Sequence, residues 1–215
     1  MHPQLERSRL LVKPFSIPQP ALFLDRDGVL IEDRNYLSDP NEVQLCTGAR
    51  DLLVHASQRG WPAVLITNQS GIARGYFNWH DYELVSDRLL KLLGVSAPLA
   101  AIYANGHGPQ APPTSWRKPS PAMLLAAVDD LNIDLNRSIL VGDRLSDLQA
   151  GASACLPWLV HVLSGHGKRE RPAVEQWASE CAHSTSKNLD FELVLLESLL
   201  NFPLDLLKPN FEPAP

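Results

Sequence analysis

Two carboxylates one residue apart follow a short apolar run near the start of the chain. Residues 21–24 contain no turn-forming residue and predict a short buried strand, and Asp25 and Asp27 come directly after it. Gly28 suits a tight turn at this point. Because crowded carboxylates repel each other, a bound cation is a natural way to keep both charged. In phosphoryl transfer, the first could attack phosphorus and the second could move the proton of the leaving group.

The same spacing also occurs in acidic loops and in incidental calcium contacts, so the rest of the chain must decide between these alternatives. Thr67 ends a second apolar run at residues 62–67. Its hydroxyl and nearby N–H groups could bind phosphate oxygens without adding charge. The alternative is a threonine packed at a strand edge and followed by a turn at Asn68.

A basic pair and a third carboxylate complete the set of candidate groups. Lys118 precedes a predicted helix start and could neutralise charge on a transferring phosphoryl group, unless Arg117 and Lys118 are only a solvated surface pair. Asp143 follows a third apolar run, and Mg²⁺ typically takes one or two protein carboxylates plus substrate phosphate. Asp147 is either a further carboxylate behind the metal ligands or a favourable charge at a helix N-terminus.

These groups need elements that bring them together, and the chain alternates short apolar runs with helical patterns. This rhythm predicts a Rossmann-like, doubly wound α/β fold, with a mainly parallel sheet and helices on both faces. In such sheets the carboxyl ends of the strands line one crevice, so the polar residues that follow them should converge. The predicted strands cover residues 21–24, 62–67, 99–103, 138–141 and 158–163, and the predicted helices are capped by Thr47, Asn78, Ser120 and Ser146.

The chain organisation predicts one domain over residues 21–190. Residues 1–20 are polar and contain prolines, which predicts a leader that is loosely ordered or packed on the surface. Residues 191–200 are amphipathic, which predicts a C-terminal helix at the start of a tail over 191–215. The tail either packs on its own domain or mediates dimerisation. No stretch is long enough for a large cap domain, so a minimal cap or none is expected.

Composition narrows the classes of partner. A net charge of −5 argues against a nucleic-acid groove, and no apolar run is long enough to span a bilayer. The first twenty residues do not form a signal peptide. Three cysteines, odd in number and widely spaced, fit reduced thiols and a cytoplasmic location. We therefore expect a small-molecule substrate and no nucleic-acid or membrane partner. The two alternatives for the tail correspond to a monomer or a weak homodimer.

In order and spacing, Asp25-x-Asp27, Thr67, Lys118 and Asp143 resemble the four motifs of the haloacid dehalogenase-like (HAD-like) phosphatases. The segments at residues 24–28, 67–75 and 117–119 are similar to those of the D-glycero-D-manno-heptose 1,7-bisphosphate phosphatases, whose relatives include the histidinol-phosphate phosphatases. The Gly-Ile-Ala-Arg-Gly run at residues 71–75 favours the heptose branch.

The resemblance implies a Mg²⁺-dependent phosphatase of a small sugar phosphate that works through an aspartyl-phosphate intermediate. Asp25 would be the nucleophile and a Mg²⁺ ligand, and Asp27 the general acid/base, with its backbone carbonyl on the metal. Thr67 and Lys118 would hold the phosphoryl group, and Asp143 would complete the metal site. The implied substrate contacts are Asn68, Arg117 and Arg144, the last of which often corresponds to lysine in the family.

One departure from the family pattern concerns a structural zinc. The family usually binds it in the loop before Arg-Lys-Pro, through Cys-x-His and Cys-x-Cys pairs. Residues 103–116 contain no cysteine, and one histidine, His107, cannot make a tetrahedral site. We therefore expect a fold without zinc, in which Trp116 and nearby prolines stiffen the loop.

Three other functions remain as alternatives. A histidinol-phosphate phosphatase, or a phosphatase of another phosphorylated metabolite, would use the same chemistry. A phosphate-binding regulatory protein without activity is opposed by the complete set of candidate groups. A phosphatase of DNA ends is disfavoured by the acidic charge balance and by the lack of an aromatic and basic track.

Overall fold

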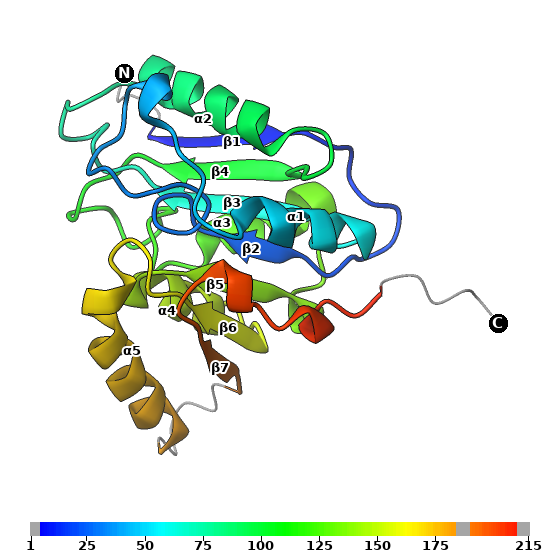
Figure 1. The fold of residues 1–215 in the computed structure, drawn as a ribbon. Coiled ribbons are helices and arrows are strands. Elements are labelled where there is room, and N and C mark those ends of the chain that lie inside the picture. The colour runs from blue at the N-terminus through cyan, green and yellow to red at the C-terminus, as the bar shows by residue number, and fades with distance from the viewer. Residues whose placement is uncertain (1–4, 184–189, 210–215) are drawn as a thin grey trace.

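The computed structural model describes residues 5–183 and 190–209, and its centre is a seven-stranded sheet (Figure 1). The strand order is β1-β4-β3-β2-β5-β6-β7, and every neighbouring pair is parallel except β1 with β4. The predicted doubly wound fold is confirmed. The strands are β1 (Glu6–Leu10), β2 (Leu22–Leu24), β3 (Ala63–Asn68), β4 (Ala101–Asn105), β5 (Ile139–Gly142), β6 (Trp158–His161) and β7 (Glu192–Leu195).

The strand order places a topological switch point beside β2. From β2 the chain adds β3 and then β4 on one side, and it crosses to the other side to form β5. The carboxyl ends of β2 and β5 therefore diverge into loops on either side of one crevice, which is where open α/β sheets bind ligands. Asp25 follows β2 and Asp143 follows β5, so the topology alone brings these two carboxylates together.

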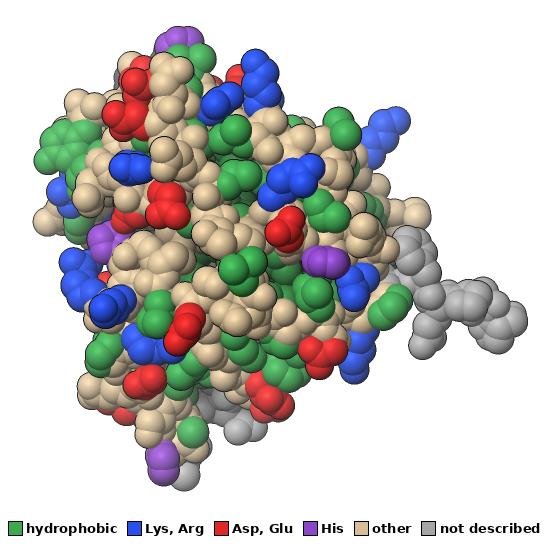
Figure 2. All heavy atoms as spheres, in the orientation of Figure 1, with side chains coloured by type: hydrophobic (Ala, Val, Ile, Leu, Met, Phe, Trp, Pro, Cys, Tyr) green, Lys and Arg blue, Asp and Glu red, His purple; other side chains and the backbone are tan. Residues whose placement is uncertain are grey.

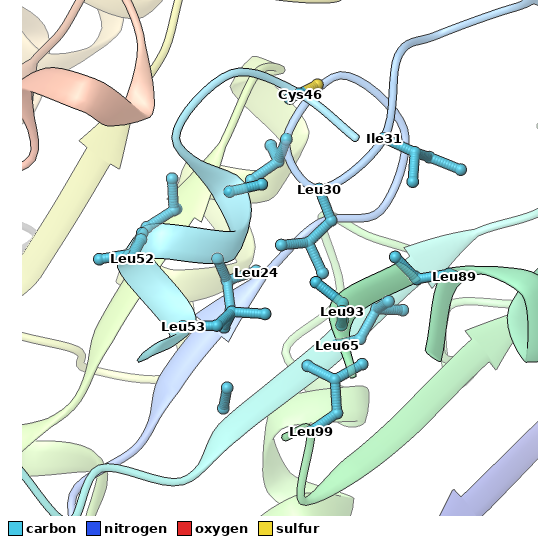
Figure 3. Close-up of a cluster of buried hydrophobic side chains, with 14 of the residues drawn as sticks. Leu24, Leu30, Ile31, Cys46, Leu52, Leu53, Leu65, Leu89, Leu93 and Leu99 are labelled. Carbon is cyan, nitrogen blue, oxygen red and sulfur yellow. The ribbon is translucent and has the colours of Figure 1, made fainter. Parts of the chain in front are cut away.

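Within residues 5–183 and 190–209, five α-helices cover the two faces of the sheet. On one face, α1 and α2 pack with the side chains of Leu24 and Leu65 (Figure 3). On the other face, α3, α4 and α5 pack with Phe23, Val64 and Leu140. The helices are α1 (Ala49–Gln58), α2 (Trp79–Leu93), α3 (Ala122–Leu131), α4 (Leu145–Ser153) and α5 (Gly167–Ala182).

The local sequence explains where α2 begins and what it buries. The Asn78 side chain accepts hydrogen bonds from the backbone N–H groups of His80 and Asp81, and the Asp81 carboxylate accepts one from the Asn78 backbone. This capping box satisfies donors that a helix start leaves without partners. Residues Tyr82, Val85, Leu89 and Leu93 recur at helical spacing and are buried against the sheet.

Both ends of the chain differ from the sequence prediction. Residues 6–10 of the predicted leader form β1, which pairs with β4 as an edge strand. The predicted helix over 191–200 is wrong: β7 and the 3₁₀ turn Leu199–Asn201 occupy that stretch. The apolar residues that suggested a helix instead extend the sheet, because Glu192–Leu195 pairs with Trp158–His161. Predictions for residues 1–4 and 210–215 lie outside the described residues.

Little structure is inserted between β2 and α1. Among the described residues, that segment contains one short 3₁₀ turn, η1 (Pro40–Glu42), so it forms a loop and not a separate cap domain.

Basic and acidic side chains are interspersed on the face shown in Figure 2. None of the helices in the described part of the chain is both long and apolar enough to cross a membrane.

Candidate active site

The ammonium group of Lys118 lies between two buried carboxylates at the end of the sheet. Its Nζ is 2.8 Å from Oδ1 of Asp25 and 2.7 Å from Oδ1 of Asp147, and it donates a hydrogen bond to the carbonyl of Ile66 at 3.0 Å. Burial lowers the pKa of Lys118, but the two carboxylates outweigh burial and raise it above the ordinary lysine value. The lysine is therefore held charged beside Asp25.

Asp25, Asp143 and Asp147 form a cluster in which one oxygen of each lies within 4.8 Å of the others. All three residues are buried. Asp143 Oδ2 accepts a hydrogen bond from the backbone N–H of His166 at 2.7 Å, whereas Asp143 Oδ1 is buried without a hydrogen-bond partner among the described residues. Hard carboxylate oxygens with a free acceptor in this geometry fit a divalent cation such as Mg²⁺.

The protein alone stabilises the charge of this cluster poorly. Burial raises the pKa of Asp25 to about 6, against the attraction of Lys118. Burial also raises the pKa of Asp143 to about 9, and the nearby carboxylates of Asp147 and Asp25 add to this effect. A bound cation would supply the charge that keeps these acids ionised at neutral pH.

Asp27 lies outside this cluster and makes a different set of contacts. The Arg26 guanidinium donates from Nε to Asp27 Oδ2 and from Nη2 to Asp27 Oδ1, both at 3.1 Å. The Gln69 amide donates to Asp27 Oδ2 at 2.8 Å and to Thr67 Oγ1 at 2.7 Å. The carboxylate is thus fixed in direction, while its side chain keeps 24% exposure toward the cavity.

Asn68, at the end of β3, fixes the lysine loop. Its side-chain amide donates to the backbone carbonyl of Lys118, and its Oδ1 accepts from the backbone N–H of Lys118, both at 3.1 Å. The predicted substrate contact Asn68 therefore also has a structural role, because these two bonds tie the loop to β3.

Gly28 allows Asp143 to approach the loop that follows β2. Its φ of +83° is a left-handed conformation that favours glycine. A Cβ at this position would lie 2.5 Å from Asp143 Oδ2. The glycine that follows the two aspartates is therefore required both by the turn and by close packing against the third carboxylate.

Asp25, Asp27 and Asp147 line a cavity of about 300 Å³. Arg74, Arg117 and Arg144 line it, and both Arg144 and Arg74 lower the pKa of Arg117, in addition to the effect of its burial. Asp33 and His166 also line the cavity and contact each other, with His166 Nε2 2.9 Å from Asp33 Oδ2. A cavity with buried acids at its floor and guanidinium groups at its wall fits an anionic ligand with a second anionic or polar group.

The structure gathers all eight sequence-predicted site residues at this end of the sheet, although not into one cluster. Asp25 and Asp143 meet beside Lys118, whereas Asp27 and Thr67 meet through Gln69. Sequence reasoning left Asp147 open and missed four other residues. For Asp147, the available signal in the sequence was its position near a predicted helix start. The four missed residues are Arg26, Gln69, Arg74 and His166, all of which line the cavity.

The loop that lacks cysteines is held by polar contacts. The His107 carbonyl accepts a hydrogen bond from Arg117 Nη1 at 3.1 Å, and the His107 ring lies 3.6 Å from the Glu6 carboxylate. The Trp116 ring packs at a tilt against Tyr103, with 5.6 Å between the ring centroids. These contacts connect the loop to β1 and β4 and support the position of Arg117.

Comparison with known proteins agrees with this geometry. A family model described as HAD-hydrolase-like matches residues 115–187. D-glycero-beta-D-manno-heptose-1,7-bisphosphate 7-phosphatase of Mesorhizobium japonicum is 47% identical over 150 residues, which cover 66% of this chain and 69% of the relative. The protein of the same name from Pasteurella multocida is 39% identical, covering 67% of this chain and 82% of that protein.

A solved structure has the same fold. D,D-heptose 1,7-bisphosphate phosphatase from B. bronchiseptica, complexed with magnesium and phosphate, superposes with a TM-score of 0.70. It is 29% identical, and the match covers 84% of this chain and 94% of that chain. The switch point of this sheet holds buried acids paired with a lysine, and the matching family model and relatives are those of HAD-like hydrolases. The chain therefore belongs to the HAD-like phosphatases, which hydrolyse phosphoric monoesters.

Proposed function

We propose that this phosphatase removes the 7-phosphate of D-glycero-β-D-manno-heptose 1,7-bisphosphate through an aspartyl-phosphate on Asp25. The substrate is suggested by the names of the relatives. The observation that carries the mechanism is the 2.8 Å contact between Lys118 and Asp25 at the floor of the cavity. A carboxylate held beside a permanent cation is a nucleophile that can meet a phosphoryl group without repelling it.

In this mechanism Asp25 forms a bond to phosphorus while the bond from phosphorus to the sugar oxygen breaks. Asp27 gives its proton to the departing oxygen, and it later takes a proton from the water that attacks the aspartyl-phosphate. Inorganic phosphate leaves and the Asp25 carboxylate is restored. Thr67 and Lys118 bind the phosphoryl oxygens and balance the charge that develops on them.

Asp25 and Asp143 would hold Mg²⁺, and the backbone carbonyl of Asp27 is the third proposed ligand. When bound, the ion supplies positive charge next to the transferring phosphate. The buried Asp143 Oδ1, which has no hydrogen-bond partner among the described residues, supports this assignment. Asp147 contacts Lys118 and accepts a hydrogen bond from the backbone N–H of Arg144 at 3.0 Å, so its proposed role is to position both.

A bisphosphate suits the charge distribution of the cavity. One phosphate group would meet Lys118, and the guanidinium groups of Arg74, Arg117 and Arg144 are available to the rest of the substrate. Three arginines whose charges oppose one another are costly to gather without an anion to neutralise them. An Arg fork matches the geometry of phosphate oxygens, which favours the distal phosphate as the anion.

The remaining properties follow from the sequence. We propose a cytoplasmic enzyme that is a monomer or weak homodimer, without nucleic-acid or membrane partners. We also propose that it folds without a structural zinc, because residues 103–116 contain no cysteine and His107 alone cannot form a tetrahedral site.

The test is phosphate release in the presence of Mg²⁺ from both anomers of heptose 1,7-bisphosphate, histidinol phosphate and fructose 1,6-bisphosphate. The Asp25→Asn variant serves as the blank. We expect Asp25-dependent turnover with a preference for the β-heptose anomer. Preference for histidinol phosphate would move the protein to that branch and overturn the substrate. Phosphate binding without turnover of any substrate would support a regulatory protein instead.

A further inference from the structure

The buried residues Arg26 and Gln69 both contact Asp27 and contact each other. Arg26 is 1% exposed and Gln69 is 4% exposed. Arg26 Nη2 donates to Gln69 Oε1 at 3.0 Å, in addition to its bonds to Asp27. The Arg26 guanidinium also lies over the Tyr82 ring, 5.5 Å from its centroid. The two side chains therefore form one connected network around a single carboxylate.

The chemistry of the network fixes the orientation of the Gln69 amide. Its oxygen faces the guanidinium, which has only donors, and its nitrogen faces a carboxylate and the Thr67 hydroxyl. The reverse orientation would place two donors together and two acceptors together. Gln69 is further anchored at its backbone, whose N–H donates to the carbonyl of Asn105 at 2.6 Å.

The network occupies the two oxygens of Asp27 unequally. Oδ2 accepts hydrogen bonds from Arg26 Nε and from Gln69 Nε2, which fill its two lone-pair directions. Oδ1 accepts one hydrogen bond among the described residues, from Arg26 Nη2 at 3.1 Å, and the same Nη2 also lies 3.0 Å from Oδ2. One lone pair of Oδ1 is therefore left for a proton, on a side chain that lines the cavity.

We propose that Arg26 and Gln69 are positioning residues that select Oδ1 of Asp27 as the atom that transfers the proton, an inference that rests on the proposed function. As the phosphorus–oxygen bond breaks, the leaving oxygen takes the bonding electrons and receives the proton of Oδ1. Gln69 also binds the Thr67 hydroxyl, so the same amide sets the distance between the proton donor and a group that holds the phosphate.

The burial of Arg26 supports a functional role. Its Nη1 is buried without a hydrogen-bond partner among the described residues. Burial acts to lower the pKa of Arg26, but the nearby acidic groups, Asp27 foremost, outweigh it and raise the pKa above the ordinary arginine value. A buried donor without a partner destabilises the folded state. An apolar residue under Tyr82 would avoid that cost, whereas it could not hold both oxygens of Asp27.

The test compares kcat/KM for phenyl phosphate with kcat/KM for p-nitrophenyl phosphate. For each ester, kcat/KM reports only the steps up to loss of the leaving group. The phenolate of phenyl phosphate is the more basic and needs the proton more. We expect Gln69→Met to lower kcat/KM for phenyl phosphate by about 30-fold and for p-nitrophenyl phosphate by less than about threefold. Asp27→Asn should show the same selectivity with a larger loss.

Three further variants keep the test informative. Gln69→Glu has the same shape but sets a carboxylate against Asp27, and we expect it to show the same selectivity. Ser86→Ala removes another buried hydrogen bond, from Ser86 Oγ to the Tyr82 carbonyl, and should leave both values unchanged. If Gln69→Met does not fold, Arg26→Lys, which keeps the charge but loses the fork, takes its place.

Equal losses on both esters in a folded Gln69 variant would overturn the inference while leaving the proposed function intact. Failure of the wild-type enzyme to show Asp25-dependent turnover of either ester or of heptose 1,7-bisphosphate would overturn the mechanism and the inference together.

Discussion

The Nζ of Lys118 lies 2.8 Å from the Oδ1 of Asp25, although the two residues come from loops more than ninety positions apart in the sequence. The contact forms because Asn68 ties the backbone of Lys118 to β3 while β2 places Asp25 beside it. It pairs the proposed nucleophile with the cation that would neutralise its phosphate.

Replacing Lys118 with Met should cost both activity and stability. The change leaves the buried carboxylates of Asp25 and Asp147 without their cation, and breaking a buried pair costs about 3 kcal/mol. We expect activity to fall by at least about 10²-fold. Urea unfolding and phosphate release measure the two effects. Lys91→Met, at an exposed residue of α2, is the matched control. An active, equally stable Lys118→Met protein would contradict the role of the lysine.

Mg²⁺ should raise the melting temperature, and more so at pH 8 than at pH 6. In the folded metal-free protein the pKa of Asp143 is about 9 and that of Asp25 about 6, both above their unfolded values. Between about pH 4 and 9 the folded state therefore holds more protons, so its stability falls as pH rises. Mg²⁺ replaces those protons, and at a hundredfold excess over Kd it contributes about 2.7 kcal/mol.

Asp143→Asn is the control for this experiment, measured by thermal unfolding with and without Mg²⁺. The variant keeps the volume of the side chain and loses the charge. We expect it to lose most of the Mg²⁺-dependent gain and part of the pH dependence. An unchanged gain in the variant would place the metal elsewhere.

Arg144→Met should weaken binding of a bisphosphate with little effect on the chemical step. Arg144 lines the cavity with Arg74 and Arg117. We expect KM for heptose 1,7-bisphosphate to rise about tenfold while kcat changes by less than about threefold. Steady-state kinetics decide the point, with the exposed Arg88→Met as the control. A fall in kcat at unchanged KM would assign Arg144 to the reaction itself.

The purified protein should contain no stoichiometric zinc after dialysis against a chelator. The loop before Lys118 has no cysteine, and its His107 lies 3.6 Å from Glu6. Elemental analysis of the dialysed protein, together with its melting temperature, measures this. One zinc per chain in a protein that unfolds when the metal is removed would refute the prediction.

Much of the site followed from sequence because it depends on local pattern and topology. Apolar runs that end in Asp25, Thr67 and Asp143 predict strand ends, and parallel strands bring strand ends together. The proposed role of Gln69 did not follow from the sequence, because folding alone brings Gln69 next to Arg26 and Asp27. No spacing distinguishes a glutamine that holds a carboxylate from one in a turn.

The C-terminal segment shows why short apolar stretches are ambiguous. Residues 191–200 have apolar residues that fit either a helix face or a strand. The deciding factor is non-local: the edge of β6 has backbone groups that Glu192–Leu195 can pair with. Similarly, Glu6–Leu10 becomes β1 because the edge of β4 is available to it.

The most direct test of the central claim is to look for phosphate on Asp25. Asp27→Asn should slow hydrolysis of the intermediate more than its formation from p-nitrophenyl phosphate, whose leaving group needs the proton least. The variant is therefore mixed with this ester and Mg²⁺, quenched in mild acid, digested and analysed by mass spectrometry. We predict that the peptide containing Asp25 gains the mass of HPO₃, and that the double variant with Asp25→Asn gains none. Wild-type turnover without phosphate on Asp25 in the trapped variant, or with phosphate on another residue, would contradict it.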